Sequence, residues 1–451
     1  MSIATSMARH VPSRNTVPWE RPAPSERAFS SRAIEARIEA AAARIADPQL
    51  RRLLENALPN TLDTTIVAAG TDERPDTFVL TGDIHAMWLR DSTAQVWPYL
   101  SSVAEDAALD RLIRGVIRRQ SEQVLLDPYA NAFLYSPEDG TEWAGDETDM
   151  RPGVHERKWE PDSLAAFLRL SAGYWRASGS TRPFDAQWKG ALELVLRTLR
   201  CEQRMEGATP YRFHRPHGDP TDMVPNGGRG APTRPNGMVH GAFRPSDDAC
   251  GLPLNVPVNL ALAAALEQAA PLAEELGASD WARQARALAG EIRAGVARDG
   301  IAGQGWAYEV DGLGGRIVMD DANAPSLLSL PYLGGCRPDD PRYLSSRRWI
   351  LSRQNPWWFS GSAAEGVGSP HTGPGRIWPI AIALQGLTSG AAFEKLACAR
   401  RLAGTHAGTY LAHESFAAND PGDYTRPWFA WANSLVGEFL ESMAIEGLLK
   451  G

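Results

Sequence analysis

The segment SRAIEARIEAAAARIADPQLRRLLENAL, residues 31–58, shows which kind of secondary structure dominates this chain. Its apolar residues recur at intervals of three and four positions, the spacing that places them on one face of an α-helix. The pair Asp47-Pro48 interrupts the pattern, and a proline inside a helix removes a backbone hydrogen bond and clashes with the preceding turn. The segment therefore predicts two helices separated at this pair.

The same helical spacing recurs along the rest of the chain. Further segments that show it are 109–128, 161–179, 184–205, 258–277, 280–300, 377–390, 391–408 and 426–451. Strand patterns are few, and the best are DTFVLTGDI (76–84) and GWAYEVDGLGGRIVMDD (305–321), of which the second is typical of a hairpin. We therefore predict an all-α protein of about a dozen helices with minor β-hairpins in the connections.

Composition and charge narrow the class of protein. The 451 residues are 43% hydrophobic and 22% charged, with a formal net charge of −8, which are ordinary values for a soluble globular protein. The basic residues are scattered and form no Lys/Arg run of the kind that nucleic-acid-binding proteins carry, so we set nucleic acid aside as a partner. No run of about 18 apolar residues is present, so we expect no membrane partner.

The cysteines and the N-terminal segment bear on the cellular location of the protein and on its domain organisation. Cys201, Cys250, Cys336 and Cys398 form no CxxC or CxxH pair, which argues against a zinc cluster or a disulfide framework and indicates a reducing compartment. Residues 1–30 lack the apolar core of a secretory signal and are rich in Pro, Ser and Arg. We expect a cytoplasmic protein with a flexible or draped arm, residues 1–30, before a single domain over residues 31–451.

The polar motifs lie between the predicted helices, outside their apolar faces. They are TGDIHAMWLRDS (81–92), HERKWEPDSL (155–164), GAFRPSDDA (241–249), VMDDANAPSLLSLPYLG (318–334), SPHTGPGRIWPIAI (369–382) and AHESFAANDPGDYTRPWFAWANS (412–434). This arrangement is typical of a helical toroid with a site at one mouth, although other all-α arrangements would satisfy the same spacing. The Gly/Pro-rich segment 214–238 is a long connection, and long structureless loops within a compact protein tend to be functional.

The first motif places Asp83, Arg90 and Asp91 in one short segment. An ion pair at the start of a helix would explain them. A clamp on sugar hydroxyls would explain them too, since a carboxylate accepts from hydroxyls while an arginine donates in a fork. Tryptophan is frequent, with 15 residues, and flat indole rings are surfaces on which sugars stack. Trp88 would therefore form a wall of such a site or belong to the core.

Two acidic groups are candidates for acid–base chemistry. Asp247 and Asp248 are adjacent carboxylates, and usually only one of two neighbours faces a given pocket. The sequence PSDD is typical of a helix N-cap, whereas a carboxyl whose pKa is raised by burial or by a neighbouring negative charge can act as a general acid. Glu414, in AHESF, would be an exposed loop residue or a general base.

Taken together, the motifs resemble those of one enzyme family. The segments TGDIHAMWLRDSTAQVWPYL, FRPSDDA, MDDANAPSLLSLPYLG, HTGPGRIWP and HESF…YTRPWFAWANS are similar to blocks of glycoside hydrolase family 125, the exo-acting α-1,6-mannosidases, and follow the family order. The resemblance implies an (α/α)6 barrel. It also implies hydrolysis of non-reducing terminal α-1,6-linked mannose from an oligosaccharide or glycan, with inversion and without a metal ion or other cofactor.

The resemblance also assigns roles to residues. It implies that Asp247 or Asp248 is the general acid, of which we favour Asp247, and that Glu414 is the general base. In an inverting enzyme two such groups lie about 6.5–9.5 Å apart, which leaves room for the attacking water. The residues expected to bind the sugar are Asp83, Trp88, Arg90, Asp91, Trp159, Glu160, Asp162, Arg244, Asp321, Asn323, His371, Arg376, Trp378, His413, Arg426 and Trp431.

Several of these assignments have alternatives. The pair Asp162-Ser163 would also cap the following helix, and any single tryptophan could belong to the core. The acidic cluster at 320–323 lacks the spacing and terminal Glu of an EF-hand, and no HExxH occurs, so we expect no metal. Two other functions stay open: an exo-glycosidase of the same barrel with glucosidase or α-1,2/1,3-mannosidase activity, and a catalytically inactive glycan-binding protein.

Overall fold

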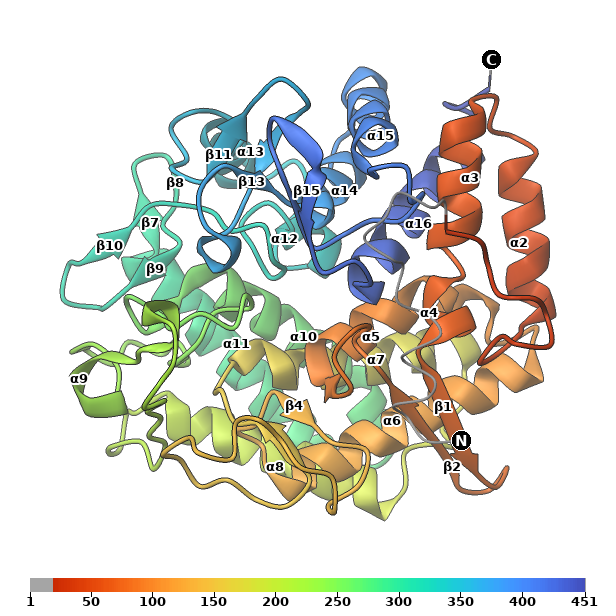
Figure 1. Cartoon of the computed structure of the whole chain (residues 1–451). Coiled ribbons are helices and arrows are strands. Elements are labelled where there is room, and N and C mark those ends of the chain that lie inside the picture. The colour runs from red at the N-terminus through yellow and green to blue at the C-terminus, as the bar shows by residue number, and fades with distance from the viewer. Residues whose placement is uncertain (1–18, 451) are drawn as a thin grey trace. The chain divides into compact units, whose positions relative to one another are not determined.

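The computed structural model describes residues 19–450 and is dominated by helices (Figure 1). These residues fall into two compact units. Unit 1 comprises residues 19–87, 91–116 and 358–450, and unit 2 comprises residues 88–90 and 117–357. The single catalytic domain expected over residues 31–451 stays a prediction.

Unit 1 combines helices from both ends of the sequence. Its elements are α2 (Arg32–Ala42), α3 (Pro48–Ala57), α4 (Asn60–Thr64), β1 (Ile66–Gly70), β2 (Pro75–Val79), η1 (Trp97–Ser102), β11 (Trp358–Ser360), β12 (Glu365–Val367), η3 (Pro370–Thr372), β13 (Arg376–Ile377), α14 (Pro379–Leu387), α15 (Ala392–Thr405), β14 (Ser415–Ala417), β15 (Asp420–Thr425) and α16 (Ala430–Ile445). Three more elements contribute residues to both units: β3 (Met87–Trp88), α5 (Leu89–Val96) and α6 (Ala107–Leu126).

The helix break predicted at Asp47-Pro48 is confirmed. The side chain of Asp47 accepts hydrogen bonds from the first backbone amides of α3, and Pro48 occupies the first helical position, where a missing N–H costs nothing. At the start of α2, the hydroxyl of Ser31 accepts from the amide of Ile34 in the same way. Capping groups therefore set both helix starts, while the apolar spacing sets the face that each helix buries.

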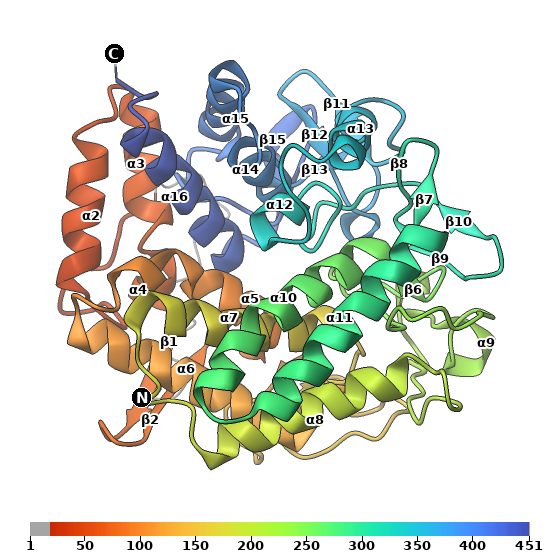
Figure 2. The ribbon, with the colours of Figure 1, turned by 180° about the vertical axis from the view of Figure 1, so that it is seen from behind.

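The last helix of the chain packs against the first helices of unit 1. In both ribbon views α16 lies beside α3 (Figures 1 and 2). The close approach requires a glycine, because a Cβ atom at Gly437 of α16 would overlap the backbone of Leu58, which follows α3. Gly386 of α14 leaves room in a similar way for the ring of Phe439.

The sheets of unit 1 are small and antiparallel. β1 pairs with β2 in the register Ile66↔Val79, and β14 joins β13 to β15. The strand predicted over residues 76–84 is confirmed only in its first half, since β2 ends at Val79 and an isolated bridge follows between Gly82 and Phe429.

Unit 2 contains the longest helices of the protein. The elements wholly within it are β4 (Ala132–Phe133), β5 (Val154–Glu156), α7 (Pro161–Ser178), α8 (Ala186–Glu202), η2 (Pro220–Asp222), α9 (Pro225–Gly228), β6 (Leu254–Asn255), α10 (Val256–Glu275), α11 (Ser279–Asp299), β7 (Ile301–Ala302), β8 (Gly305–Trp306), β9 (Glu309–Val310), β10 (Arg316–Ile317), α12 (Leu330–Leu333) and α13 (Pro341–Ile350). The hairpin predicted in residues 305–321 is confirmed, with β9 paired to β10.

Helix α10 is the core helix of unit 2. It packs against α7 and α11, and Figure 2 shows it beside α11. Among the described residues it is the one helix long and apolar enough to cross a membrane by length and composition, but 83% of that apolar window is buried inside the protein. Residues 256–266 are all buried, which explains why this half of α10 is apolar on every side, whereas Glu267, Pro271 and Glu274 of the second half are exposed.

Part of the predicted N-terminal arm is ordered against unit 1. Residues 1–18 lie outside the described residues. Beyond them, the guanidinium of Arg21 donates to the carboxylates of Asp63 and Glu35 at distances from 2.7 to 3.1 Å. The backbone amide of Trp19 donates to the carbonyl of Thr409. Residues Trp19 and Arg21 thus contact unit 1, and the flexible or draped arm expected over residues 1–30 stays a prediction.

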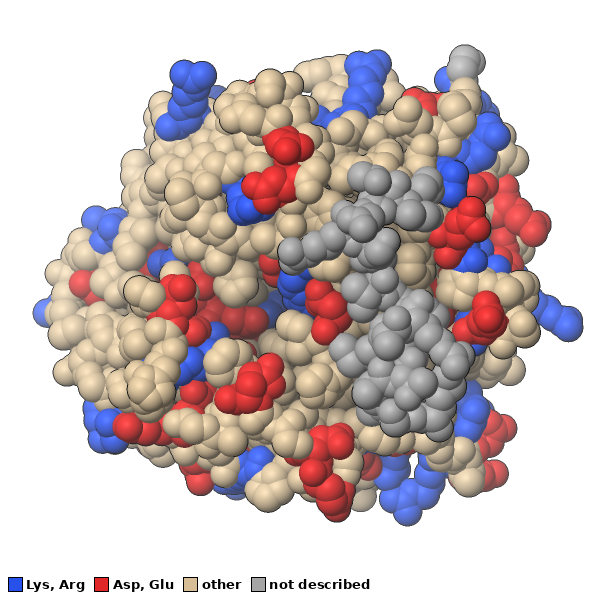
Figure 3. Space-filling view, in the orientation of Figure 1, with Lys and Arg blue, Asp and Glu red and all other residues tan. Residues whose placement is uncertain are grey.

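Charged side chains of both signs alternate over the face seen in Figure 3. The basic side chains visible among the described residues on this face are scattered. The pattern agrees with the scattered basic residues of the sequence and with the small negative net charge of −8.

The contact between α16 and α3 predicts a stability change. Gly437→Ala places a methyl group against the backbone of Leu58, so we expect a loss of about 1–3 kcal/mol in the free energy of unfolding from overpacking. Gly404→Ala, in α15 of the same unit, meets open space and should be neutral or stabilising by up to about 1 kcal/mol. Urea unfolding followed by circular dichroism measures both, and equal effects of the two substitutions would contradict the close approach.

Candidate functional site

The polar residues of unit 2 gather around Arg90, near the start of α5. One terminal nitrogen of its guanidinium donates to Glu160 at 2.6 Å and lies 3.2 Å from Asp162. The other terminal nitrogen lies 3.2 Å from Oδ1 of Asp247. A single cation thus contacts three carboxylates that are 70, 72 and 157 positions away in the sequence. Four of the predicted site residues are brought together in this carboxylate cluster.

An amide side chain joins the same cluster. Nδ2 of Asn131 donates to Glu156 at 3.0 Å and lies 3.4 Å from Glu160 and 3.3 Å from Asp247. Burial within the cluster is unequal, because the side chain of Glu160 has no exposed surface whereas that of Asp247 is 23% exposed. Asp247 is therefore the carboxylate of the cluster that a molecule in solvent can reach.

Burial makes ionisation of the inner carboxyls unfavourable. It raises the pKa of Glu160 well above its usual range, the charge of Arg90 lowers it in part, and Asp247 raises it further. Burial also raises the pKa of Asp162, against the opposing effect of Arg90. Neighbouring carboxyl groups in such a site tend to share protons, which is the condition under which one of them can donate a proton near neutral pH.

The structure distinguishes the two adjacent aspartates. Asp247 and Asp248 lie in a tight turn in which the amide of Asp247 donates to the carbonyl of Arg244, and the amide of Arg244 donates to the carbonyl of Asp248. The N-cap alternative for PSDD is wrong, since the next long helix begins at Val256 and is capped by Asn255. Asp248 is only 2% exposed, so Asp247 presents the accessible carboxylate.

Other predicted residues of unit 2 have structural partners. The guanidinium of Arg244 pairs with Glu309 through bonds of 2.6 and 3.0 Å. Asp162 lies in the first turn of α7 and is not its N-cap, which is Glu160. Arg244 pairs with the buried Glu309, and Asp162 lies near the buried Arg90. These polar contacts of both side chains are therefore made within the protein.

The acidic cluster at residues 320–323 is a buried turn. Asp321 accepts hydrogen bonds from the backbone and side-chain nitrogens of Asn323. Asp320 accepts from the amides of Leu327 and Leu328. Burial raises the pKa of Asp320 to about 8 despite these bonds. The sugar-binding role of Asp321 and Asn323 stays a prediction.

A second polar group lies in unit 1 around Arg426. Its Nε and one terminal nitrogen contact Oδ1 of Asp83 at 2.8 and 2.7 Å, and its other terminal nitrogen lies 3.7 Å from Oε1 of Glu414. Burial lowers the pKa of Arg426, but Asp83, Glu414 and Asp91 together raise it above its ordinary value. The guanidinium of Arg426, itself a predicted residue, thus interacts electrostatically with three other predicted residues, Asp83, Glu414 and Asp91.

His413 holds the segment next to Glu414. Its ring stacks on that of Tyr424, with centroids 3.7 Å apart and planes within 6°, and Nε2 lies 3.1 Å from the hydroxyl of Thr409. Burial lowers the pKa of His413 to about 4, so the ring is neutral at neutral pH. A neutral, stacked histidine fixes the backbone of its neighbour without adding charge.

The predicted tryptophans belong to the packed interior of their units. Trp88, Trp159, Trp378 and Trp431 are all 5% exposed or less. The indole N–H of Trp159 donates to the carbonyl of His240, and that of Trp378 donates to the hydroxyl of Thr372. Their role as stacking surfaces for a sugar stays a prediction.

Two predicted residues near η3 lie at the surface of unit 1. The guanidinium of Arg376 pairs with Asp423 at 2.7 Å. His371 lies edge-on to Trp378, with ring centroids 6.3 Å apart. The sugar-binding role of both residues also stays a prediction.

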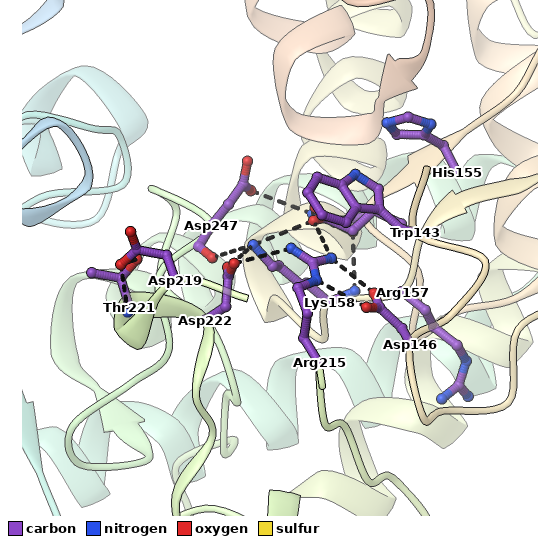
Figure 4. A network of polar contacts seen from close by, with 12 residues as sticks. Trp143, Asp146, His155, Arg157, Lys158, Arg215, Asp219, Thr221, Asp222 and Asp247 are labelled. Carbon is purple, nitrogen blue, oxygen red and sulfur yellow. Dashed lines mark hydrogen bonds and ion pairs between the residues drawn. The ribbon is translucent and has the colours of Figure 1, made fainter. Parts of the chain in front are cut away.

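Several polar residues of unit 2 were missed from the sequence. Figure 4 shows Lys158 and Arg215 among acidic side chains that include Asp146 and Asp222, with Asp247 beside them. These residues are scattered from position 146 to position 247, and no local spacing relates them. Two signals were available: the motif HERKWEPDSL, which contains Lys158, and the Gly/Pro-rich segment 214–238, which supplies Arg215 and Asp222.

A surface cavity of about 780 Å³ in unit 2 lies apart from the predicted residues. Tyr129, Arg157, Arg197 and Arg212 help to line it, and none of the predicted site residues does. Within residues 19–450, no three His, Cys, Asp or Glu side chains are grouped as a metal site would need.

Comparison with known proteins identifies the class. The family model for metal-independent α-mannosidase (GH125) matches residues 47–441. A solved structure of a metal-independent α-mannosidase from Streptococcus pneumoniae, in a non-productive complex with α-1,6-mannobiose, is 38% identical, with a TM-score of 0.88 over 93% of this chain and 99% of that one. The meiotically up-regulated gene 157 protein of Schizosaccharomyces pombe is 38% identical over 96% of this chain and 90% of its own length.

More distant structures share the fold alone. A bacterial glucoamylase in complex with acarbose is 14% identical, with a TM-score of 0.53 over 88% of this chain and 56% of that one. The fold is therefore that of the (α/α)6 glycosidases, and the protein is a glycoside hydrolase, an α-mannosidase. The chain belongs to glycoside hydrolase family 125, as the resemblance of its motifs implied.

The carboxylate cluster predicts a pH-dependent loss of stability. Arg90→Met removes the cation that lowers the pKa of Glu160 and Asp162, so the native state then holds more protons than the unfolded state. Stability therefore falls as pH rises, and we expect a loss of about 3–5 kcal/mol near neutral pH that shrinks at lower pH. Urea unfolding at about pH 5 and pH 8 measures the difference.

The double variant Arg90→Met/Asp162→Asn is the matched control for this prediction. It removes one of the stranded carboxylates and should recover part of the stability lost at the higher pH. A loss that is equal at both pH values, or a double variant no better than the single one, would contradict the role of Arg90 as the counter-ion of buried carboxylates.

Proposed function

We propose that this α-mannosidase removes non-reducing terminal α-1,6-linked mannose from oligosaccharides or glycans and inverts the anomeric configuration. The observation that carries the catalytic part is Asp247, the solvent-accessible carboxylate in a cluster of otherwise buried carboxyls. The linkage is supported by the complex of the pneumococcal relative with α-1,6-mannobiose. A neutral mannose oligosaccharide is accordingly the proposed partner.

Asp247 is the proposed general acid. As the glycosidic C–O bond breaks, its carboxyl proton passes to the leaving oxygen, and the carboxylate that results is stabilised by Arg90 at 3.2 Å. Glu160 belongs to the same cluster, and its pKa is raised, so the neighbouring carboxyls can share a proton that is available for transfer through Asp247. Arg90 then stabilises the carboxylate that remains on Asp247 after the transfer.

Glu414 is the proposed general base. It accepts a proton from the water that attacks the anomeric carbon, so that the water oxygen forms the new bond as the glycosidic bond breaks. Its carboxylate is 7% exposed, and its nearest cation is Arg426, which Asp83 holds through two contacts. Asp83 therefore fixes the position of the charge beside Glu414.

Proton NMR with α-1,6-mannobiose tests the stereochemistry. We expect β-mannose as the first product, before mutarotation, and a loss of activity of at least about 100-fold in Glu414→Ala. Glu446→Ala, which removes a surface carboxylate paired with Lys395, is the control and should keep most activity.

The outcomes of that experiment separate the competing functions. α-Mannose as the first product would contradict inversion. Release of glucose, or cleavage of an α-1,2 or α-1,3 mannobiose in place of the α-1,6 isomer, would assign another exo-glycosidase activity. Binding of mannobiose without any hydrolysis would indicate an inactive glycan-binding protein.

Leaving-group dependence tests the general acid. A dinitrophenolate departs without a proton, so Asp247→Asn should lose about 100-fold or more in kcat/KM on α-1,6-mannobiose and far less on 2,4-dinitrophenyl α-mannoside. Asp248→Asn is the matched control and should affect the two substrates equally. If Asp248→Asn alone shows the leaving-group dependence, the acid is Asp248.

A further inference from the structure

The turn that carries Asp247 has an unusual backbone. Asp247 has a φ of +65°, in the left-handed region where a side chain other than that of glycine costs about 1–2 kcal/mol. Aspartate is among the residues that tolerate this region best, but such a conformation persists only where the surroundings determine it. Contacts from outside the turn are therefore needed to hold the residue in place.

Lys158 supplies one of these contacts. Its ammonium donates to the backbone carbonyl of Asp247 at 2.7 Å and to the carboxylate of Asp222 at 2.7 Å, and it lies 3.3 Å from Glu156. The side chain of Lys158 is 4% exposed. In Figure 4 the carbonyl oxygen of Asp247 faces the ammonium, while the carboxylate points away from it. Lys158 thus binds the main chain of Asp247, while the carboxylate of Asp247 contacts Arg90 and Asn131.

The ammonium of Lys158 stays charged in this environment. Burial lowers its pKa, but the carboxylates of Glu156, Asp247 and Asp222 together raise it above its ordinary value. A charged donor forms a stronger hydrogen bond to a carbonyl than a neutral one. The bond to the Asp247 carbonyl is consequently a strong one.

The Gly/Pro-rich segment 214–238 supplies the other contacts. Its short helix η2 places the carbonyl of Thr221 2.7 Å from the amide of Ala249, just after the aspartate pair. Asp222 accepts from Lys158, and its second oxygen lies 3.2 Å from Arg215. Arg215 in turn pairs with Asp146 through bonds of 2.9 and 2.8 Å. The segment therefore holds the turn directly at Ala249 and, through Lys158, at Asp247.

We propose that Lys158 and Asp222 are positioning residues that orient the Asp247 carboxyl toward the leaving-group oxygen. The proposal rests on the proposed function, in which Asp247 is the general acid. Lys158 contacts the main chain of the turn and Asp222 contacts Lys158, and neither takes part in proton transfer itself. A displacement of about 1 Å in a catalytic group can reduce the rate 100-fold. Loss of the contact between Lys158 and the Asp247 carbonyl should therefore slow the step in which Asp247 donates its proton.

A purely structural role would have a different signature. If Lys158 and Asp222 only neutralised charge inside unit 2, their loss would lower the amount of folded protein and affect all substrates alike. If they position Asp247, the loss depends on whether the leaving group needs a proton. Comparison of α-1,6-mannobiose with 2,4-dinitrophenyl α-mannoside, on the full chain, separates these roles.

We expect Lys158→Met to reduce kcat/KM on α-1,6-mannobiose by about 100-fold and on the dinitrophenyl substrate by less than about threefold. Lys158→Arg, which keeps a charged donor, should recover part of the loss. In an Asp247→Asn background, Lys158→Met should add little further loss, because both changes act on one step. Lys189→Met, which removes a surface lysine bonded to the carbonyl of Leu276, should leave both rates unchanged.

Asp222→Ala is the second variant and carries the test if Lys158→Met does not fold. It removes the acceptor that Lys158 and Arg215 share, and we expect the same substrate dependence with a loss of about tenfold. Equal losses on both substrates in either folded variant would overturn the proposal. Equal losses in Asp247→Asn itself would instead overturn the acid role of Asp247, so the two failures are distinguishable.

Discussion

Arg90 is the group on which the polar interior of unit 2 depends. Three carboxylates that lie far apart in the sequence meet at its guanidinium, and without a cation their mutual repulsion and burial would make that meeting unfavourable. A planar fork suits this task better than the point charge of a lysine, because it can contact several oxygens in one plane. The carboxyls of Glu160 and Asp162 are almost completely buried. The electrostatic environment of the accessible Asp247 is therefore set by charged groups that solvent does not reach.

Backbone and charge are controlled by different residues around Asp247. Arg90 and Asn131 contact its carboxylate, whereas Lys158 contacts its carbonyl oxygen. In unit 1 a similar division is visible at Glu414. Arg426 lies near its carboxylate, and the adjacent residue, the neutral His413, is held in place by stacking on Tyr424. Each candidate catalytic group is therefore oriented by one partner and electrostatically tuned by another, an arrangement that keeps rotamer and protonation independently adjustable.

The sequence predicted the parts of the fold that local spacing controls. The helices around Asp47-Pro48 and the hairpin at β9–β10 follow from capping, proline and turn chemistry. Helix α13 was missed because few of its residues are buried apolar ones, so the helical spacing is weak. The motifs predicted the family, and they named Arg90, Asp247 and Glu414. Lys158, in the motif HERKWEPDSL, and Glu309 were not assigned a role, since the residues that they contact, Asp247 and Arg244, lie 89 and 65 positions away in the sequence.

The division of the chain between the two units bears on the order in which the protein is made. Apart from residues 88–90, unit 2 is one continuous stretch, residues 117–357, whereas unit 1 needs both α3 and α16. During synthesis the stretch for unit 2 leaves the ribosome complete while the partner of α3 has not been translated. The apolar faces of α2 and α3 are therefore without their final cover for most of translation, and nascent chains that stop before α16 are the ones we expect chaperones and proteases to recognise.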